Sequence, residues 1–158
     1  MIFVTTGTDP RGFERLVRRM DEIAGRIDEE VIMQIGGTEY APRNAVHFGY
    51  TTQERIRDLC RAANVVVTHA GVGTILDALQ QGTPVVVVPR LRQYGEVIDD
   101  HQVGLTRELE KAGKITAVYN LEGLEKAVAR VDRNPLEFQT DRRLAIALRR
   151  HIAESDRS

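Results

Sequence analysis

Cysteine is almost absent from the sequence: Cys60 is the single thiol in 158 residues. One cysteine cannot form an internal disulfide, and it excludes a zinc site made of several thiolates. No apolar run approaches the roughly 20 residues needed to span a bilayer. The start, Met1-Ile2-Phe3-Val4, leads directly into a strand-like segment and lacks the basic region of a signal peptide. We therefore expect a cytoplasmic protein that reaches a membrane only through a partner.

An excess of either charge is absent as well. The chain has 22 basic and 23 acidic side chains and a formal net charge of −1, whereas nucleic-acid binding requires a clustered positive surface. Hydrophobic residues make up 42% of the chain and charged residues 28%, as in globular proteins. The length predicts a single domain over residues 1–158, in which we expect the polar end, residues 150–158, to fray.

Short apolar, β-branched runs alternate with segments that repeat hydrophobic residues at helical spacing. The predicted strands are residues 2–5, 31–35, 45–48, 65–68, 85–88 and 115–119. The predicted helices are residues 13–27, 53–62, 71–81, 98–112, 121–130 and 138–153. Strands that are apolar throughout and separated by helices indicate a parallel sheet covered on both faces. The predicted fold class is therefore α/β, a single Rossmann-like doubly wound parallel sheet.

Ligands of such sheets bind at the carboxyl ends of the strands, so the loops after the strands are the candidate sites. The first loop, Thr5-Thr6-Gly7-Thr8, precedes a helix and can bring backbone N–H groups close to a diphosphate. A tight turn between strand and helix, without a ligand, explains this loop equally well. In Phe48-Gly49-Tyr50, the aromatic ring of Tyr50 either holds a nucleobase or closes the core. The sequence contains no P-loop and no GxGxxG motif.

The most informative loop follows the strand 65–68. It reads His69-Ala70-Gly71-Val72-Gly73-Thr74, and Asp77 lies on the same helix face as Thr74. The two glycines permit an anion to approach closely, and Thr74 offers a hydroxyl near the helix N-terminus. The Asp77 carboxylate can accept a hydrogen bond from each hydroxyl of a vicinal diol such as that of ribose. In the alternative interpretation, Asp77 only complements the helix dipole and His69 is a neutral, hydrogen-bonded loop histidine.

The loop after the strand 85–88 is long and polar and extends from Pro89 to Gln102, which is typical of a functional loop. Asp99, Asp100 and His101 are adjacent, and adjacent helical residues do not share a face. At most two of them converge, so we expect no metal site here. His101 and Gln102 can instead donate hydrogen bonds to sugar hydroxyls or phosphate.

The last predicted helix repeats Leu144, Leu148 and Ile152 at intervals of four among basic residues. A basic amphipathic helix either rests on an anionic membrane or packs across the domain. Asp141 and Glu154 dilute the basic cluster, so we favour packing.

Three motifs follow one another in the chain: HAGxGT…D, then GxPVVVVP, then a loop ending in DDHQ. This order resembles the C-terminal, donor-binding half of family 28 glycosyltransferases. The resemblance covers about residues 1–130. It is closest to the short stand-alone subunits, the Alg13-like eukaryotic type and the PssE-type bacterial exopolysaccharide subunits. The opening segment Phe3-Val4-Thr5-Thr6-Gly7-Thr8 fits these subunits, and the segment from Pro89 to Gln102 is similar to the bacterial type.

This resemblance implies a role for each matching residue near the phosphates. Gly7 and Thr8 correspond to the loop that approaches the phosphates of the donor. In the family, a second motif holds the diphosphate at a helix N-terminus through its backbone and a hydroxyl. The matching residues here are His69, Gly71, Gly73 and Thr74.

The resemblance also implies contacts to the rest of the donor. Asp77 corresponds to the acid that binds the ribose diol, where larger members of the family usually have a glutamate, one methylene longer. Tyr50 or its neighbours correspond to the loop that reads uracil. Gln102, with His101, corresponds to the position that contacts the hydroxyls of the sugar ring.

The function that the resemblance implies is one half of a GT-B enzyme. The chain would bind the UDP-sugar of a two-component inverting glycosyltransferase that transfers a hexosyl group, GlcNAc or glucuronic acid, to a lipid-linked acceptor. A membrane-associated acceptor-binding subunit would complete the site and supply the catalytic base, for which His101 is a weak candidate here. No metal or other cofactor is expected. The alternative function is a non-catalytic nucleotide-binding or scaffold module of a polysaccharide-synthesis complex.

Overall fold

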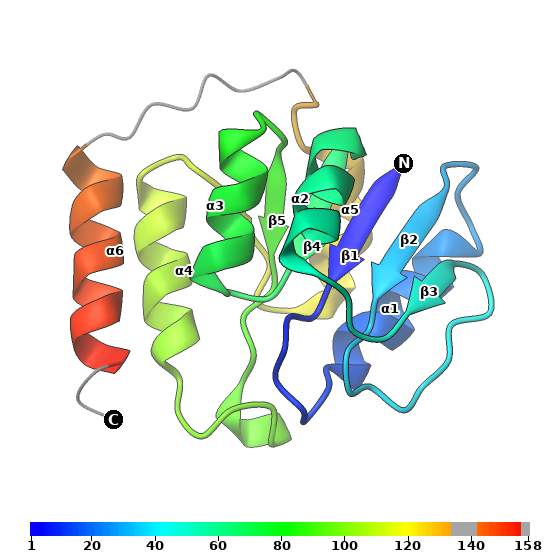
Figure 1. The fold of residues 1–158 in the computed structure, drawn as a ribbon, viewed down its shortest axis with the longest axis horizontal. Coiled ribbons are helices and arrows are strands. Elements are labelled where there is room, and N and C mark those ends of the chain that lie inside the picture. The colour runs from blue at the N-terminus through cyan, green and yellow to red at the C-terminus, as the bar shows by residue number, and fades with distance from the viewer. Residues whose placement is uncertain (134–141, 156–158) are drawn as a thin grey trace.

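The computed structural model describes residues 1–133 and 142–155 and is built around one six-stranded sheet (Figure 1). The strands are β1 (Ile2–Thr5), β2 (Val31–Gln34), β3 (Val46–Phe48), β4 (Val65–Thr68), β5 (Val85–Val87) and β6 (Thr116–Ala117). Their order is β3-β2-β1-β4-β5-β6, and all neighbouring strands are parallel. The predicted doubly wound α/β sheet is therefore confirmed.

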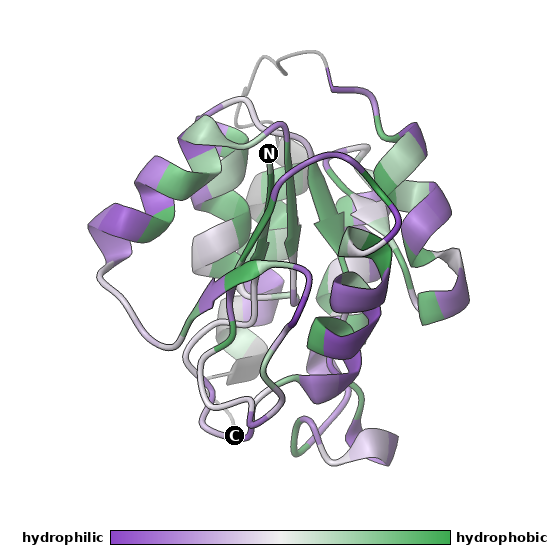
Figure 2. Ribbon diagram, turned by 90° about the vertical axis from the view of Figure 1, so that its right-hand side faces the viewer, coloured by the Kyte–Doolittle hydropathy of each residue, from purple (hydrophilic) through white to green (hydrophobic). Residues whose placement is uncertain are grey.

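Helices cover both faces of the sheet because alternate residues of each strand point to opposite sides. Ile2 and Val4 pack with α1 (Glu14–Ala24) and α5 (Leu124–Arg130). Phe3 belongs to the second core, on the other face. That core contains residues of α2 (Gln53–Ala62), α3 (Val72–Gln80), α4 (His101–Lys111) and α6 (Arg142–Ser155). Figure 2 shows hydrophobic strands between helices that carry both hydrophilic and hydrophobic residues.

One predicted boundary is wrong in the region after β5. The helix predicted over residues 98–112 begins only at His101, and Ile98 is 76% exposed outside it. A 3-10 turn, η1 (Arg92–Tyr94), lies in between. The Asp100 carboxylate accepts a hydrogen bond from the Arg92 N–H at 3.1 Å, and the Asp99 carboxylate accepts one from the His101 N–H at 3.0 Å. Such side-chain bonds to the backbone compete with the helix and delay its start.

Other boundaries differ by smaller amounts. The predicted edge strand 115–119 pairs with β5 only through the two residues of β6. The predicted helix 121–130 consists of a 3-10 turn, η2 (Leu121–Gly123), followed by α5.

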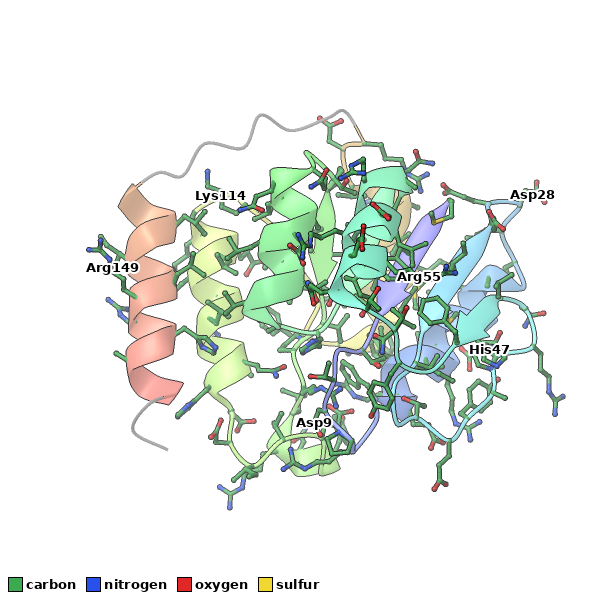
Figure 3. All side chains as sticks on the ribbon, viewed as in Figure 1. Asp9, Asp28, His47, Arg55, Lys114 and Arg149 are labelled. Atoms are coloured by element: carbon green, nitrogen blue, oxygen red, sulfur yellow. The ribbon has the colours of Figure 1, made fainter. Side chains whose placement is uncertain are left out.

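The helix α6 packs against α4, which agrees with the packing interpretation of its apolar stripe. Leu144 is fully buried, and Leu148 packs against the same core. Arg150 Nη1 lies 3.8 Å from the Glu108 carboxylate, whereas Arg149 points away from the sheet (Figure 3).

The helix α6 continues through Ser155, and the expected fraying of residues 150–158 stays a prediction. Residues 138–141 of the predicted last helix and the final residues 156–158 lie outside the described part of the chain. No helix of the described residues is long and apolar enough to cross a membrane.

At the amino ends of β1 and β4, one carboxylate joins several segments. Glu29 accepts hydrogen bonds from the Met1 ammonium at 3.0 Å, Asn64 Nδ2 at 2.9 Å and Arg133 Nη1 at 2.6 Å. Burial alone raises the pKa of Glu29, but these hydrogen bonds outweigh it and lower the pKa from 4.5 to about 2. Because the folded-state pKa is depressed, the stabilisation is fully present above the unfolded pKa and is lost as pH falls toward 2.

We expect the Glu29→Gln variant to have a free energy of unfolding about 1–2 kcal/mol lower than the wild type at pH 7, because charged hydrogen bonds are removed. The difference should shrink as the pH falls from 4.5 to 2, because Glu29 itself becomes protonated. Urea denaturation over this pH range measures it. Glu30→Gln, at an exposed neighbouring carboxylate, is the control. A difference that does not change with pH would contradict the role of Glu29.

Candidate functional site

The carboxyl ends of β1 and β4 lie side by side in the centre of the sheet. From this point the strand order runs outward through β2 and β3 in one direction and through β5 and β6 in the other. Doubly wound sheets bind ligands outside such a switch point. The loops after β1 and β5 approach one another at this edge, at the bottom of Figure 1, and Asp9 of the first loop is labelled in Figure 3.

The side chain of Gln34, the last residue of β2, fixes the loop after β1. Its Oε1 accepts hydrogen bonds from Thr5 Oγ1 at 2.6 Å and from the N–H groups of Thr6 and Gly7, both at 3.2 Å. Its Nε2 donates to the carbonyls of Gly7 and Gly49, both at 3.1 Å. The Gly7 N–H is therefore directed toward Gln34, and the role expected of Gly7 and Thr8 near the phosphates stays a prediction. This one amide also connects the loop after β1 to the loop after β3.

His69, directly after β4, fills the space between two glycines. A Cβ on Gly7 or on Gly71 would lie within 3.0 Å of the imidazole, and Gly7 also has a φ of +76°. Both positions therefore require glycine. Burial and the nearby charge of Arg90 lower the pKa of His69 from 6.5 to about 4. The imidazole is neutral at pH 7, and its Nδ1 is buried without a partner among the described residues.

The helix α3 begins beside His69. Its N-cap, Gly71, provides no side-chain hydrogen bond. A Cβ on Gly73 would meet no atom of the described residues within 4 Å, and the half-buried Thr74 follows in the first turn. The first N–H groups of a helix have no partner within it and carry partial positive charge. This end of α3 can therefore bind an anion.

Asp77 lies one turn further along α3 and faces α2. Its Oδ2 accepts a hydrogen bond from Gln53 Nε2, and Arg57 Nε lies 3.9 Å from its Oδ1. Only 15% of the Asp77 side chain is exposed. Our sequence analysis missed Gln53 and Arg57. Their spacing of four places them on one face of α2, but no sequence signal shows that this face meets Asp77.

Arg90, after β5, is a fully buried residue that our sequence analysis also missed. Nη1 donates to the Gly12 carbonyl, Nη2 donates to the Thr6 carbonyl at 2.7 Å, and the guanidinium lies 4.8 Å from the centre of the Phe13 ring. Burial lowers the pKa of Arg90. No described carboxylate forms an ion pair with Arg90, so backbone carbonyls and an aromatic face stabilise the charge. The residue ties the loop after β5 to the loop after β1.

The long loop after β5 is also fastened to α1. The buried Glu96 accepts hydrogen bonds from Arg15 Nε at 2.8 Å and Nη2 at 3.0 Å, and from the Leu91 N–H at 2.9 Å. The Arg15 guanidinium lies 4.7 Å from the centre of the Tyr94 ring. The middle of this polar loop thus has a defined structure, although Tyr94 itself is exposed.

The remaining predicted residues lie around this centre. Gln102 points inward, because its Oε1 accepts a hydrogen bond from the Arg90 N–H at 3.1 Å. His101 is 42% exposed, and its Nδ1 is 3.6 Å from Asp99. Thr8 and Tyr50 are exposed, and the Tyr50 hydroxyl lies near Gly37. Their roles, like those of the other site residues, remain predictions.

The described residues contain no group of three His, Cys, Asp or Glu side chains that could hold a metal ion.

The chain was compared with known protein families. A model of the glycosyltransferase family 28 C-terminal domain matches residues 1–155. The chain belongs to this family.

Two relatives of this family 28 domain are described as the UDP-N-acetylglucosamine transferase subunit ALG13. The protein of Eremothecium gossypii is 29% identical over 126 residues, which cover 78% of this chain and 60% of the relative. The Homo sapiens protein is 26% identical over 125 residues, which cover 72% of this chain and 10% of the relative. The family 28 domain therefore matches only part of the length of either relative.

Solved structures share the fold. An NMR structure of ALG13 has a TM-score of 0.60 at 18% identity, and the match covers 96% of this chain and 94% of that one. The crystal structure of the glycotransferase of kitacinnamycin has a TM-score of 0.62 at 19% identity, and the match covers 97% of this chain and 38% of that one. The family 28 domain thus has the architecture of one half of a GT-B fold.

We expect Arg90→Ala to lower the free energy of unfolding by about 3 kcal/mol or more, because two carbonyls lose charged donors worth about 1.5–3 kcal/mol each. Arg92→Ala, at an exposed position of the same loop, should change it by less than about 0.5 kcal/mol. Urea denaturation followed by circular dichroism compares the variants. Arg90→Lys replaces the alanine variant if that variant does not fold. Equal effects at Arg90 and Arg92 would show that the buried guanidinium does not hold the loops.

Proposed function

We propose that the chain is the UDP-sugar-binding subunit of a two-component inverting glycosyltransferase. The observation that carries this proposal is the start of α3, where an uncapped helix N-terminus, the open position of Gly73 and the Asp77 carboxylate follow one another at the switch point of the sheet. Membership of family 28 supports a glycosyltransferase. The names of the ALG13 relatives support UDP as the nucleotide of the donor.

A second protein component is part of the proposal. The match covers 94% of the ALG13 structure but 38% of the kitacinnamycin glycotransferase and 36% of the glycosyltransferase SsfS6. The ALG13 relatives are themselves described as subunits. We assign the acceptor-binding half to a membrane-associated subunit that brings this chain to the cytoplasmic face of the membrane. The similarity of the Pro89–Gln102 segment to bacterial subunits makes exopolysaccharide synthesis the proposed setting.

In the proposed reaction, a hydroxyl of a lipid-linked acceptor attacks the anomeric carbon of the donor sugar, GlcNAc or glucuronic acid. The bond from this carbon to the diphosphate oxygen breaks, UDP leaves with the electron pair, and the configuration inverts. The hydroxyl proton passes to a base that we assign to the acceptor subunit, with His101 as the candidate within this chain. The N–H groups at the start of α3 stabilise the charge on the leaving diphosphate. The proposal includes no metal ion or other cofactor.

We expect the purified chain to bind UDP more tightly than GDP in a calorimetric or NMR titration. Asp77→Ala should weaken UDP binding by about tenfold or more, because hydrogen bonds to a charged group are lost. Binding that does not distinguish UDP from GDP, or that Asp77→Ala leaves unchanged, would contradict the proposed donor site. A complex with the acceptor subunit that binds UDP but transfers no sugar would instead establish a non-catalytic nucleotide-binding module.

Gly73→Ala separates the ligand role of the α3 N-terminus from its role in folding. Since a Cβ at Gly73 has open space and alanine favours helix, thermal unfolding should show unchanged or higher stability, by up to about 1 kcal/mol. UDP affinity should nevertheless fall, because the added methyl group hinders the approach of the diphosphate to the first N–H groups. Unchanged affinity in a stable variant would place the diphosphate elsewhere.

A further inference from the structure

Two helices, not one, supply the polar groups around Asp77. We propose that Gln53 and Asp77 together accept hydrogen bonds from the two hydroxyls of the ribose. Gln53 thereby makes the site selective for ribonucleoside over 2′-deoxyribonucleoside diphosphates. This inference rests on the proposed function, because it requires the nucleotide to lie at the start of α3. It adds a specificity-determining residue that the sequence motif does not contain.

The orientation of the Gln53 amide follows from its partner. Gln53 is the first residue of α2, and its Nε2 donates a hydrogen bond to Asp77 Oδ2. A carboxylate has only acceptor atoms, so the NH₂ group of the amide must face Asp77. The other amide atom, Oε1, is the acceptor and is attached to the same carbon. No donor in the described part of the chain forms a hydrogen bond with it.

The chemistry of a vicinal diol matches this pair. The diol has two O–H donors and requires two acceptors close together. Asp77 offers Oδ1, while its Oδ2 is engaged by Gln53. The Oε1 of Gln53 is the second acceptor, to which we assign the 2′-hydroxyl. The pair thereby compensates for the side chain of Asp77, which is one methylene shorter than glutamate. A 2′-deoxyribose lacks one of the two donors and forms one hydrogen bond fewer with the pair, so it binds less tightly.

Arg57 completes the arrangement from the same face of α2. Its Nε lies 3.9 Å from Asp77 Oδ1, so a positive charge stands beside the oxygen that we assign to the diol. The side chain of Arg57 is 52% exposed, and screening by water limits this attraction. The selectivity therefore comes from the geometry of Asp77 and Gln53 and not from the charge of Arg57.

The Gln53 contact also joins α2 to α3, and the chain provides a matched control for this structural role. Arg61 Nε donates to Gln81 Oε1 at 3.0 Å and joins the same two helices away from Asp77. Gln81→Ala removes that contact and leaves the Asp77 pair intact. The start of α2 does not depend on the Gln53 side chain, because the Thr52 hydroxyl caps it through the Arg55 N–H. Gln53→Ala should therefore fold.

The test compares the dissociation constants of UDP and 2′-deoxy-UDP by calorimetry for the wild type, Gln53→Ala and Gln81→Ala. We expect the wild type to prefer UDP by about tenfold or more. Gln53→Ala should reduce this preference to about threefold or less by weakening UDP binding, while the affinity for 2′-deoxy-UDP stays the same. Gln81→Ala should keep the full preference.

Two results would overturn the inference and leave the donor site in place: a wild type without preference for UDP, or a Gln53→Ala variant that loses affinity equally for both nucleotides. The second result would show that Gln53 only supports the helices. A wild type that binds neither nucleotide overturns the donor site itself, and the inference falls with it.

Discussion

The hydrogen bonds of Gln34 are the constraint on which the carboxyl end of the sheet depends. A buried amide is costly unless all its donors and acceptors are satisfied, and Gln34 achieves this with the loop after β1 and with Gly49. These hydrogen bonds hold the loop after β1 in a conformation that brings Gly7 against the His69 imidazole. His69 in turn sits against Gly71, where α3 begins. The position of the α3 N-terminus thus follows from a contact made two strands away.

Charged and neutral groups alternate around the start of α3. The neutral imidazole of His69 separates the start of α3 from the loop after β1, and the buried guanidinium of Arg90 lies behind that loop. Arg90 is held by carbonyl oxygens, so its positive charge is not cancelled by a described ion pair. Both the guanidinium and the helix N-terminus favour an anion at this edge. Asp77, the negative group of the site, lies further along α3, where it faces α2.

The sequence predicts the elements better than the contacts between them. Periodicity places every strand and helix of the described chain close to its observed position, because burial on a regular element repeats locally. The predicted start of α4 is wrong, because the side chains of Asp99 and Asp100 form hydrogen bonds with the N–H groups of His101 and Arg92 in a turn that precedes the helix. The motif from His69 to Asp77 predicts which loop is important, because glycines and a helix start are local features. It does not reveal Gln34, Gln53 or Arg90, whose partners lie 15 to 84 positions away in the chain.

The ion pair of Arg15 with Glu96 has a consequence for the entropy of binding. A long polar loop ordinarily samples many conformations, and a ligand that orders it must overcome that conformational entropy. Here Glu96 of the loop after β5 is already bound to Arg15 of α1 and accepts a hydrogen bond from the Leu91 N–H within the loop, and Arg90 holds the beginning of the loop. Whatever molecule binds against this loop meets a surface formed in advance. Its association is therefore disfavoured mainly by its own loss of freedom, and only slightly by the ordering of the protein.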